Sequence, residues 1–173
     1  MASLGHIAIG LAVARATRPA RGTTLAFVAA IFGWSALSLL PDLDVVGRAW
    51  GIRYGDEWGH RGATHSFVFC AGLGAIAGVL ARARGGSALR VGAWVAFVLI
   101  SHPLLDVLTD GGRGCALFWP FDQGRYFAPF RPIPVAPIGR AYVSAVGLRV
   151  ALAELVMFSP LLLYALWPRR DRS

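Results

Sequence analysis

The sequence has little charge and no lysine. Only 15% of the 173 residues are charged, and all 17 basic residues are arginine, whereas about 25% of a soluble domain is charged. The formal net charge of +8 would suggest a nucleic-acid partner in a soluble protein. Because 56% of the residues are hydrophobic and the mean hydropathy is +0.58, we expect a lipid bilayer as the partner instead, and no specific nucleic acid.

Cysteine and sequence repeats are equally scarce. The two cysteines, Cys70 and Cys115, fit neither a disulfide framework nor a CxxC metal motif. The apolar N-terminal stretch lacks the positive residues that begin a secretory signal, so we expect it to be retained. A chain of this length without repeats predicts one domain, residues 1–173.

Long apolar runs dominate the rest of the chain. A helix needs about 20 apolar residues to cross a bilayer, and four runs approach or reach that length. A fifth run, 4–14, is shorter. We therefore predict an all-α fold, a polytopic membrane bundle of four to five transmembrane helices. The stretch 116–140 is too rich in proline to form a continuous helix. The four long runs are 23–40, 66–81, 89–105 and 148–167.

The arginines orient this bundle. Short loops dense in arginine are typical of the cytoplasmic side of a membrane, and the loops 15–22 and 82–90 and the C-terminal tail have this composition. With five crossings, the N-terminus and the loops 41–64 and 106–147 lie on the outer side. The predicted topology is N-out and C-in.

Histidine and aspartate gather at the predicted outer face. The chain has four histidines, and the topology places each of them near an outer helix end. His102, Asp106 and Asp110 share one face of a helix because they are four residues apart. Ionisable groups at membrane depth cost several kcal/mol unless they are paired or functional. The converging residues are His6, Asp42, Asp44, His60, His65, His102 and Asp106.

This composition predicts a divalent metal site, because imidazole together with carboxylate suits zinc, manganese or iron. Zinc is the leading choice. Each residue also has an ordinary structural explanation. His6 can be a hydrogen-bonded core histidine, His60 an exposed loop residue, and His65 with Ser66 can cap a helix. Asp42 or Asp44 after Pro41 can form a turn or a cap, Asp110-Gly111-Gly112 is a turn signal, and Arg61 can face solvent or lipid headgroups.

Short motifs along the chain resemble a known family. They are HxAxG at 6–10, LLPDLD at 39–44, HRGxTHS at 60–66, SHPxLDxxTxGG at 101–112 and FWPF at 118–121. Together they resemble the YdjM-like family of inner-membrane metal-dependent hydrolases, which is distantly similar to zinc-dependent phospholipase C and the zinc-dependent single-strand nucleases. The resemblance implies a helical fold in a bacterial inner membrane.

The resemblance also implies a ligand set. Metal-ligand roles carry over to His6, Asp44, His65, His102 and Asp106, and His60 completes the set. The sequence has neither the N-terminal tryptophan nor the HxxxE pair of the soluble enzymes. We therefore expect one or two ions rather than three.

The resulting hypothesis is a membrane-bound hydrolase of phosphoesters, such as a lipid headgroup or a lipid-linked phosphate. A metal-activated water would be the nucleophile, Asp42 or Asp110 would accept its proton, and Arg61 would offset the phosphate charge. The aromatic residues of 118–130 would lie at the membrane interface.

Two other classes of function remain open. The metal could stabilise a membrane scaffold or binding protein that catalyses nothing. A transporter is less favoured, because the polar residues concentrate at one face and the sequence shows no paired broken helices.

Overall fold

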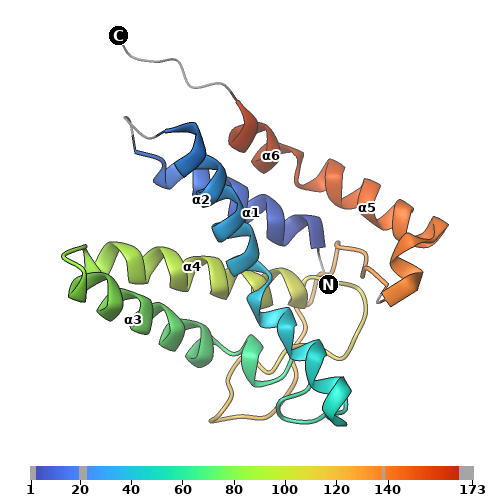
Figure 1. Ribbon diagram of the computed structural model, residues 1–173. Helices are drawn as coiled ribbons and strands as arrows, with labels where there is room; N and C mark the ends of the chain where they lie inside the picture. The colour runs from blue at the N-terminus through green and yellow to red at the C-terminus, as the bar shows by residue number, and fades with distance from the viewer. Residues whose placement is uncertain (1–2, 20–22, 138, 168–173) are drawn as a thin grey trace.

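The computed structural model describes residues 3–19, 23–137 and 139–167, and its regular structure is helical (Figure 1). The predicted all-α class is confirmed. The predicted cytoplasmic residues Arg21, Arg169, Arg170 and Arg172 lie outside the described residues. In chain order the elements are α1 (Ser3–Thr17), α2 (Thr24–Ser38), the 3-10 helices η1 (Leu40–Trp50) and η2 (Ala63–His65), α3 (Phe67–Ala83), α4 (Ala88–Val107), the 3-10 helix η3 (Gly139–Val143), α5 (Ala145–Met157) and α6 (Ser159–Leu166).

Hydroxyl residues begin four of the helices. In each case the side-chain oxygen accepts a hydrogen bond from the backbone N–H three residues later. This contact satisfies one of the N–H groups that a helix start leaves without a partner. Polar residues at the edges of the apolar runs therefore mark the helix boundaries. The capping residues are Thr23, Ser66, Ser87 and Ser144.

Among the described residues, α4 alone is both long and apolar enough to cross a membrane, with 20 residues. Two helix pairs pass the same test together but are bent, α2 with η1 by 54° and α5 with α6 by 65°. Helices α1 and α3 are apolar but shorter. Length and composition therefore give one to three membrane-crossing segments, and the larger number of four to five stays a prediction.

The bent pairs correct two expectations. The run 148–167 is not one helix, because it breaks at Phe158 and α6 begins with Pro160 in its first turn, where proline has no N–H to continue the preceding helix. The segment 41–64, expected to be a loop, contains most of η1. Broken helices are thus present, contrary to the expectation from the sequence.

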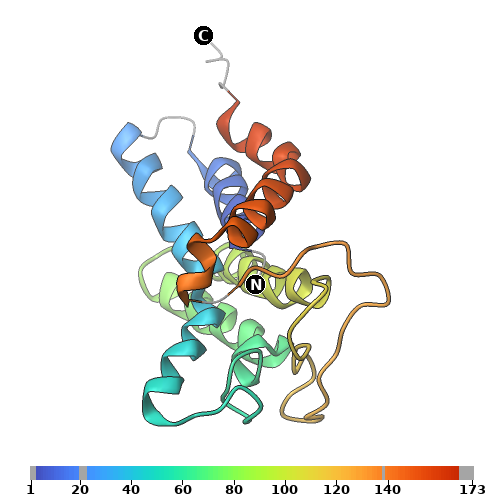
Figure 2. The ribbon, with the colours of Figure 1, turned by 90° about the vertical axis from the view of Figure 1, so that its right-hand side faces the viewer.

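Helices α3 and α4 form a closely packed antiparallel hairpin. The two helices lie side by side in both views (Figures 1 and 2). Glycines allow this approach. A Cβ atom on Gly74 would lie 2.6 Å from Cβ of Ala96 and 2.9 Å from the carbonyl oxygen of Gly92. Small residues at such contacts bring two backbones together, as in many membrane helix pairs.

Helix α1 packs against α2, α4, α5 and α6. The long irregular segment after α4 joins this core through Ile133, which is buried with Ala8 and Phe158. A parallel bridge between Thr109 and Ile133 fixes the segment beside the end of α4. The start of α1 and the end of α4 consequently lie close together (Figure 2).

The α3–α4 contact gives a direct test. We expect Gly74→Leu to lower the free energy of unfolding by about 1–3 kcal/mol, the usual cost of overpacking, because its side chain would collide with Ala96 and Gly92. Gly72→Leu is the matched control, since no atom lies within 4 Å of a Cβ placed there. Thermal unfolding in detergent measures both variants. Equal melting temperatures would contradict the close contact.

Candidate metal centre

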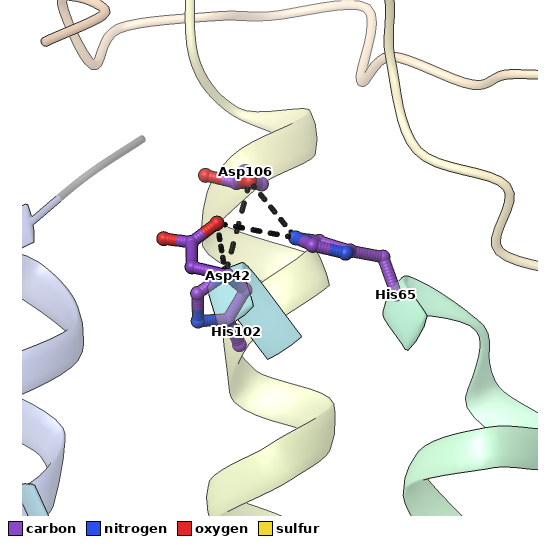
Figure 3. Close-up of side chains that lie close together, drawn as sticks. All are labelled: Asp42, His65, His102 and Asp106. Carbon is purple, nitrogen blue, oxygen red and sulfur yellow. Dashed lines mark ion pairs between the residues drawn. The ribbon is translucent and has the colours of Figure 1, made fainter. Parts of the chain in front are cut away.

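Four side chains from three segments converge near the end of α4 (Figure 3). Asp42 comes from η1, His65 from η2, and His102 and Asp106 from consecutive turns of α4. Each of these residues is buried, and His65, His102 and Asp106 have no exposed surface. Local structure explains the pairing on α4, because residues four apart lie on the same helix face.

The distances within this group fit a metal site. Oδ1 of Asp42 lies 3.5 Å from Nε2 of His65 and 3.4 Å from Nε2 of His102. Oδ2 of Asp106 lies 3.6 and 3.9 Å from the same two nitrogens. For metal bonds of about 2.0–2.2 Å, adjacent atoms of a tetrahedral site lie roughly 3.3–3.6 Å apart. These four atoms could therefore hold one metal ion.

Both histidines present Nε2 to the centre because their Nδ1 atoms have other partners. Nδ1 of His102 lies 2.7 Å from the backbone carbonyl oxygen of Ser38. Nδ1 of His65 lies 3.2 Å from Oδ2 of Asp44. Such outer contacts fix the ring orientation of metal-binding histidines. The two Nε2 atoms make no hydrogen bond to the described residues, so they are available to a cation.

A second group lies directly behind the first. Asp44, His60 and His65 also offer ligand atoms within 4.8 Å of one another. In this group Oδ1 of Asp44 lies 2.8 Å from Nδ1 of His60, and its Oδ2 accepts hydrogen bonds from Thr64 Oγ1 and the backbone N–H of Arg61. These contacts have hydrogen-bond lengths, and they tie η1 to the segment before α3.

His6 joins the centre from α1. Its ring stacks on that of His102 at a centroid distance of 3.7 Å, and its Nε2 lies 3.5 Å from Oδ1 of Asp106. The start of α1 is itself held by Glu154, whose carboxylate accepts hydrogen bonds from the backbone N–H groups of Leu4 and Gly5. Glu154 thereby fixes the helix turn that carries His6.

Arg61 connects the centre to the turn after α4. Its Nε lies 2.9 Å from Oδ2 of Asp106, and its two terminal nitrogens donate to the carbonyl oxygen of Gly111 and to Thr109 Oγ1. Burial lowers the pKa of Arg61, but the charge of Asp106 and the smaller effects of its other neighbours together raise it. The guanidinium is therefore a permanent cation inside the protein. Arg61 also adopts the left-handed φ of 63°, which these buried contacts stabilise.

Opposing effects act on His65. Burial lowers its pKa, but the nearby carboxylates of Asp42, Asp44 and Asp106 together outweigh burial and raise the pKa to about 9. The carboxylates around His65 thus attract positive charge strongly, either as a proton or as a cation.

The predicted site residues fall into two sets. The structure brings together His6, Asp42, Asp44, His60, Arg61, His65, His102 and Asp106. Asp110 instead lies at the surface, where its carboxylate accepts a hydrogen bond from the backbone N–H of Val135. Its catalytic role stays a prediction.

Sequence reasoning missed several supporting groups. Glu154 could have been found, because an acid inside an apolar run is a recognised functional signal. The carbonyl oxygen of Ser38 carries no such signal. Cys70, for which the sequence suggested no role, donates through Sγ to the carbonyl oxygen of Leu99 at 3.4 Å. That carbonyl needs a partner because Pro103, four residues later, has no N–H to donate.

Comparisons with known proteins agree with this picture. The family model described as YdjM inner membrane protein matches residues 1–170. The chain belongs to the YdjM inner membrane protein family. A relative from Escherichia coli strain K12, named inner membrane protein YbcI, is 38% identical over 146 residues, which cover 81% of this chain and 84% of the relative. No solved structure matches. The family membership that the motifs predicted is confirmed. The names of the family and of the relative indicate that this protein lies in an inner membrane.

The Arg61 contacts make a prediction about stability. We expect Arg61→Lys to destabilise this YdjM-family protein by about 1.5–3 kcal/mol, the usual worth of hydrogen bonds to a charged group, because lysine cannot reproduce the fork of a guanidinium. The control is Arg131→Lys, since Arg131 is exposed and lies over the ring of Phe127. Chemical denaturation of both variants in detergent provides the measurement, and equal stability would contradict the contact.

Proposed function

We propose that the protein is a membrane-bound, zinc-type hydrolase of phosphoesters, such as a lipid headgroup or a lipid-linked phosphate. The observation that carries the proposal is the group of Asp42, His65, His102 and Asp106, whose ligand atoms lie within 4.8 Å of one another. When bound there, the ion would lower the pKa of a water molecule and polarise the phosphoester. Mixed imidazole and carboxylate ligands in this geometry suit zinc.

Charge balance supports a divalent cation. Asp42, Asp44 and Asp106 have side chains at most 8% exposed, and Arg61 is the guanidinium buried beside them. Three carboxylates and one guanidinium leave two negative charges when the histidines are neutral. A divalent cation would balance that charge, and uncompensated buried charge is costly.

The residues divide into ligands and a proton acceptor. Asp42, His65 and His102 would hold the ion, because three protein ligands leave a position for water in catalytic zinc sites. Oδ2 of Asp106 lies 3.6 and 3.9 Å from the two ligand nitrogens, close enough to accept the proton of the attacking water. Arg61 and His6 hold Asp106 in place.

In this scheme the predicted ligands Asp44 and His60 do not bind the ion but orient other side chains. Asp44 fixes the ring of His65, and His60 fixes Asp44. One ion is then sufficient.

The membrane setting supports a lipid-derived substrate. The segment 108–137, which joins α4 to the rest of the fold, carries strongly exposed aromatic residues, with Phe121 87% and Phe130 74% exposed. Aromatic rings favour the membrane interface. We propose that this segment lies at the outer interface of a bundle of four to five membrane helices, with the metal centre beside it.

One observation favours a second function. Counting Asp106, four protein atoms could surround the ion, and structural zinc sites are closed in this way. A scaffold stabilised by metal would lose thermal stability when a chelator removes the ion. It would hydrolyse no phosphoester in either state.

The first test removes one ligand. We expect protein purified without chelator to contain about one zinc ion per chain and to hydrolyse bis(p-nitrophenyl) phosphate, and His102→Ala to lose both properties, because its Nε2 is a ligand. Asp122→Ala is the control, since Asp122 is exposed and contacts Tyr126. Elemental analysis and a colorimetric assay measure the outcomes. Metal-free wild-type protein would refute the proposal.

The second test asks whether Asp44 orients the ring of His65 for metal binding. Asp44→Asn should weaken metal affinity by roughly 10–100-fold, the usual effect of removing an outer partner of a metal-binding histidine. Competition with a chromophoric chelator measures the affinity. Asp122→Asn should leave it unchanged. An unchanged affinity in Asp44→Asn would show that His65 does not depend on this carboxylate.

A further inference from the structure

A separate pocket lies next to the metal centre. It has a volume of about 530 Å³ and is lined by Arg53, Tyr54, Gly55, Asp56 and Arg113. This volume is within the range of small-ligand sites, roughly 300–1,000 Å³. None of the lining residues belongs to the metal centre, and no sequence motif pointed to them.

Tyr54 forms the wall between the pocket and the centre. Its ring meets the ring of His60 edge-on at a centroid distance of 5.2 Å, and Nδ1 of His60 lies 3.6 Å from Oδ1 of Asp42. On its other side, a Cβ atom at Gly112 would lie 3.0 Å from the Tyr54 hydroxyl and 2.8 Å from a terminal nitrogen of Arg61. Tyr54 and His60 therefore lie between the pocket and Asp42 of the metal centre.

Positive charge gathers around this wall. The guanidinium carbons of Arg48, Arg113 and Arg125 lie 5.8, 5.9 and 6.0 Å from the centre of the Tyr54 ring. Arg125 serves the fold, because it donates to the carbonyl oxygens of His60, Tyr54 and Asp56. Arg113 and Arg53 remain at the pocket surface as charged donors.

One acid partly offsets this charge. Oδ1 of Asp56 lies 3.4 Å from Nε of Arg53, and Oδ2 accepts the backbone N–H of Arg53. Arg113 also lines the pocket and lies against Gly55, with a terminal nitrogen 2.7 Å from a Cβ placed on that glycine. Two arginines against one acid leave the pocket positive.

The expected side of the membrane makes these arginines unusual. In the N-out topology they lie outside, where the membrane-orientation rule disfavours dense arginine. Arginine binds phosphate through parallel hydrogen bonds. A pocket beside a phosphoester-cleaving centre could therefore hold a second phosphate of the same substrate, and binding energy gained away from the reacting bond can position that bond.

We propose that Arg113 and Arg53 bind a phosphate group of the substrate that does not itself react, so that the substrate carries at least two phosphate groups. The inference rests on the proposed hydrolase function. Tyr54 sets the separation between the bound phosphate and the reacting one. A membrane lipid with a diphosphate or phosphorylated headgroup and a soluble diphosphate share this chemistry.

Calorimetric titration of the metal-loaded, detergent-purified protein with inorganic pyrophosphate tests the proposal. We expect binding, and the double variant Arg53→Gln/Arg113→Gln should weaken it on the order of tenfold or more, since it removes two charge-assisted contacts to the phosphate. Zinc content should not change. Arg131→Gln, an exposed arginine away from the pocket, should bind pyrophosphate like the wild type.

A chelator separates this idea from the hydrolase proposal. Pyrophosphate binding that persists after metal removal and still depends on Arg53 and Arg113 supports the pocket, whatever the metal content of the protein. Binding that disappears with the metal, or that ignores both arginines, would overturn it. Metal-free wild-type protein that binds pyrophosphate through the two arginines would refute the hydrolase alone.

Two further arms identify the source of the phosphate. Nanodiscs of phosphatidylcholine with a diphosphate-linked isoprenoid lipid should compete with pyrophosphate if the lipid is the ligand. Soluble nucleoside diphosphates should compete if the ligand is free in solution. Competition by either one supports a two-phosphate ligand, and competition by neither contradicts it.

Discussion

The contact between Arg61 and Asp106 is the constraint on which the rest of the site depends. Asp106 has no exposed surface and faces His6, His65 and His102 as well as the guanidinium. A buried carboxylate needs a nearby positive charge, because the free energy lost by removing a charge from water exceeds the free energy gained from most single contacts. The guanidinium supplies it and also joins the loop before η2 to the turn after α4. Helix α1, the loop before η2, and η2 itself are thereby held against the end of α4.

The balance of charge explains why the centre suits a cation. The acids outnumber the buried arginine, and the raised pKa of His65 shows that the site can also attract a proton. A proton on His65 and a divalent ion at its Nε2 are alternative ways to supply positive charge. Metal affinity therefore depends on pH in such sites. The hydrogen bonds from the Nδ1 side favour the ion, because they direct both Nε2 atoms toward one point.

Short helices and irregular segments, rather than a uniform bundle of long helices, position the side chains of the metal centre. The 3-10 helices η1 and η2 and the last turns of α4 carry most of the polar groups of the centre, while α3 packs on α4 through glycines and carries none of them. The hydrophobic core around Ile133 holds the long segment after α4 against α1 and α6. A polar centre and a small apolar core thus lie side by side, and each limits the movement of the other.

The sequence by itself determined the helical class, the positions of α1 to α4 and the residue types of the centre. Those features follow from local spacing and hydropathy, which a one-dimensional pattern records. Tertiary structure alone decided the bends after Ser38 and Met157, the orienting role of a backbone carbonyl at Ser38, and the surface position of Asp110. It also brought Glu154 to the start of α1 and the arginines around Tyr54. These depend on contacts between residues far apart in the chain, and such contacts leave no regular spacing for a sequence to show.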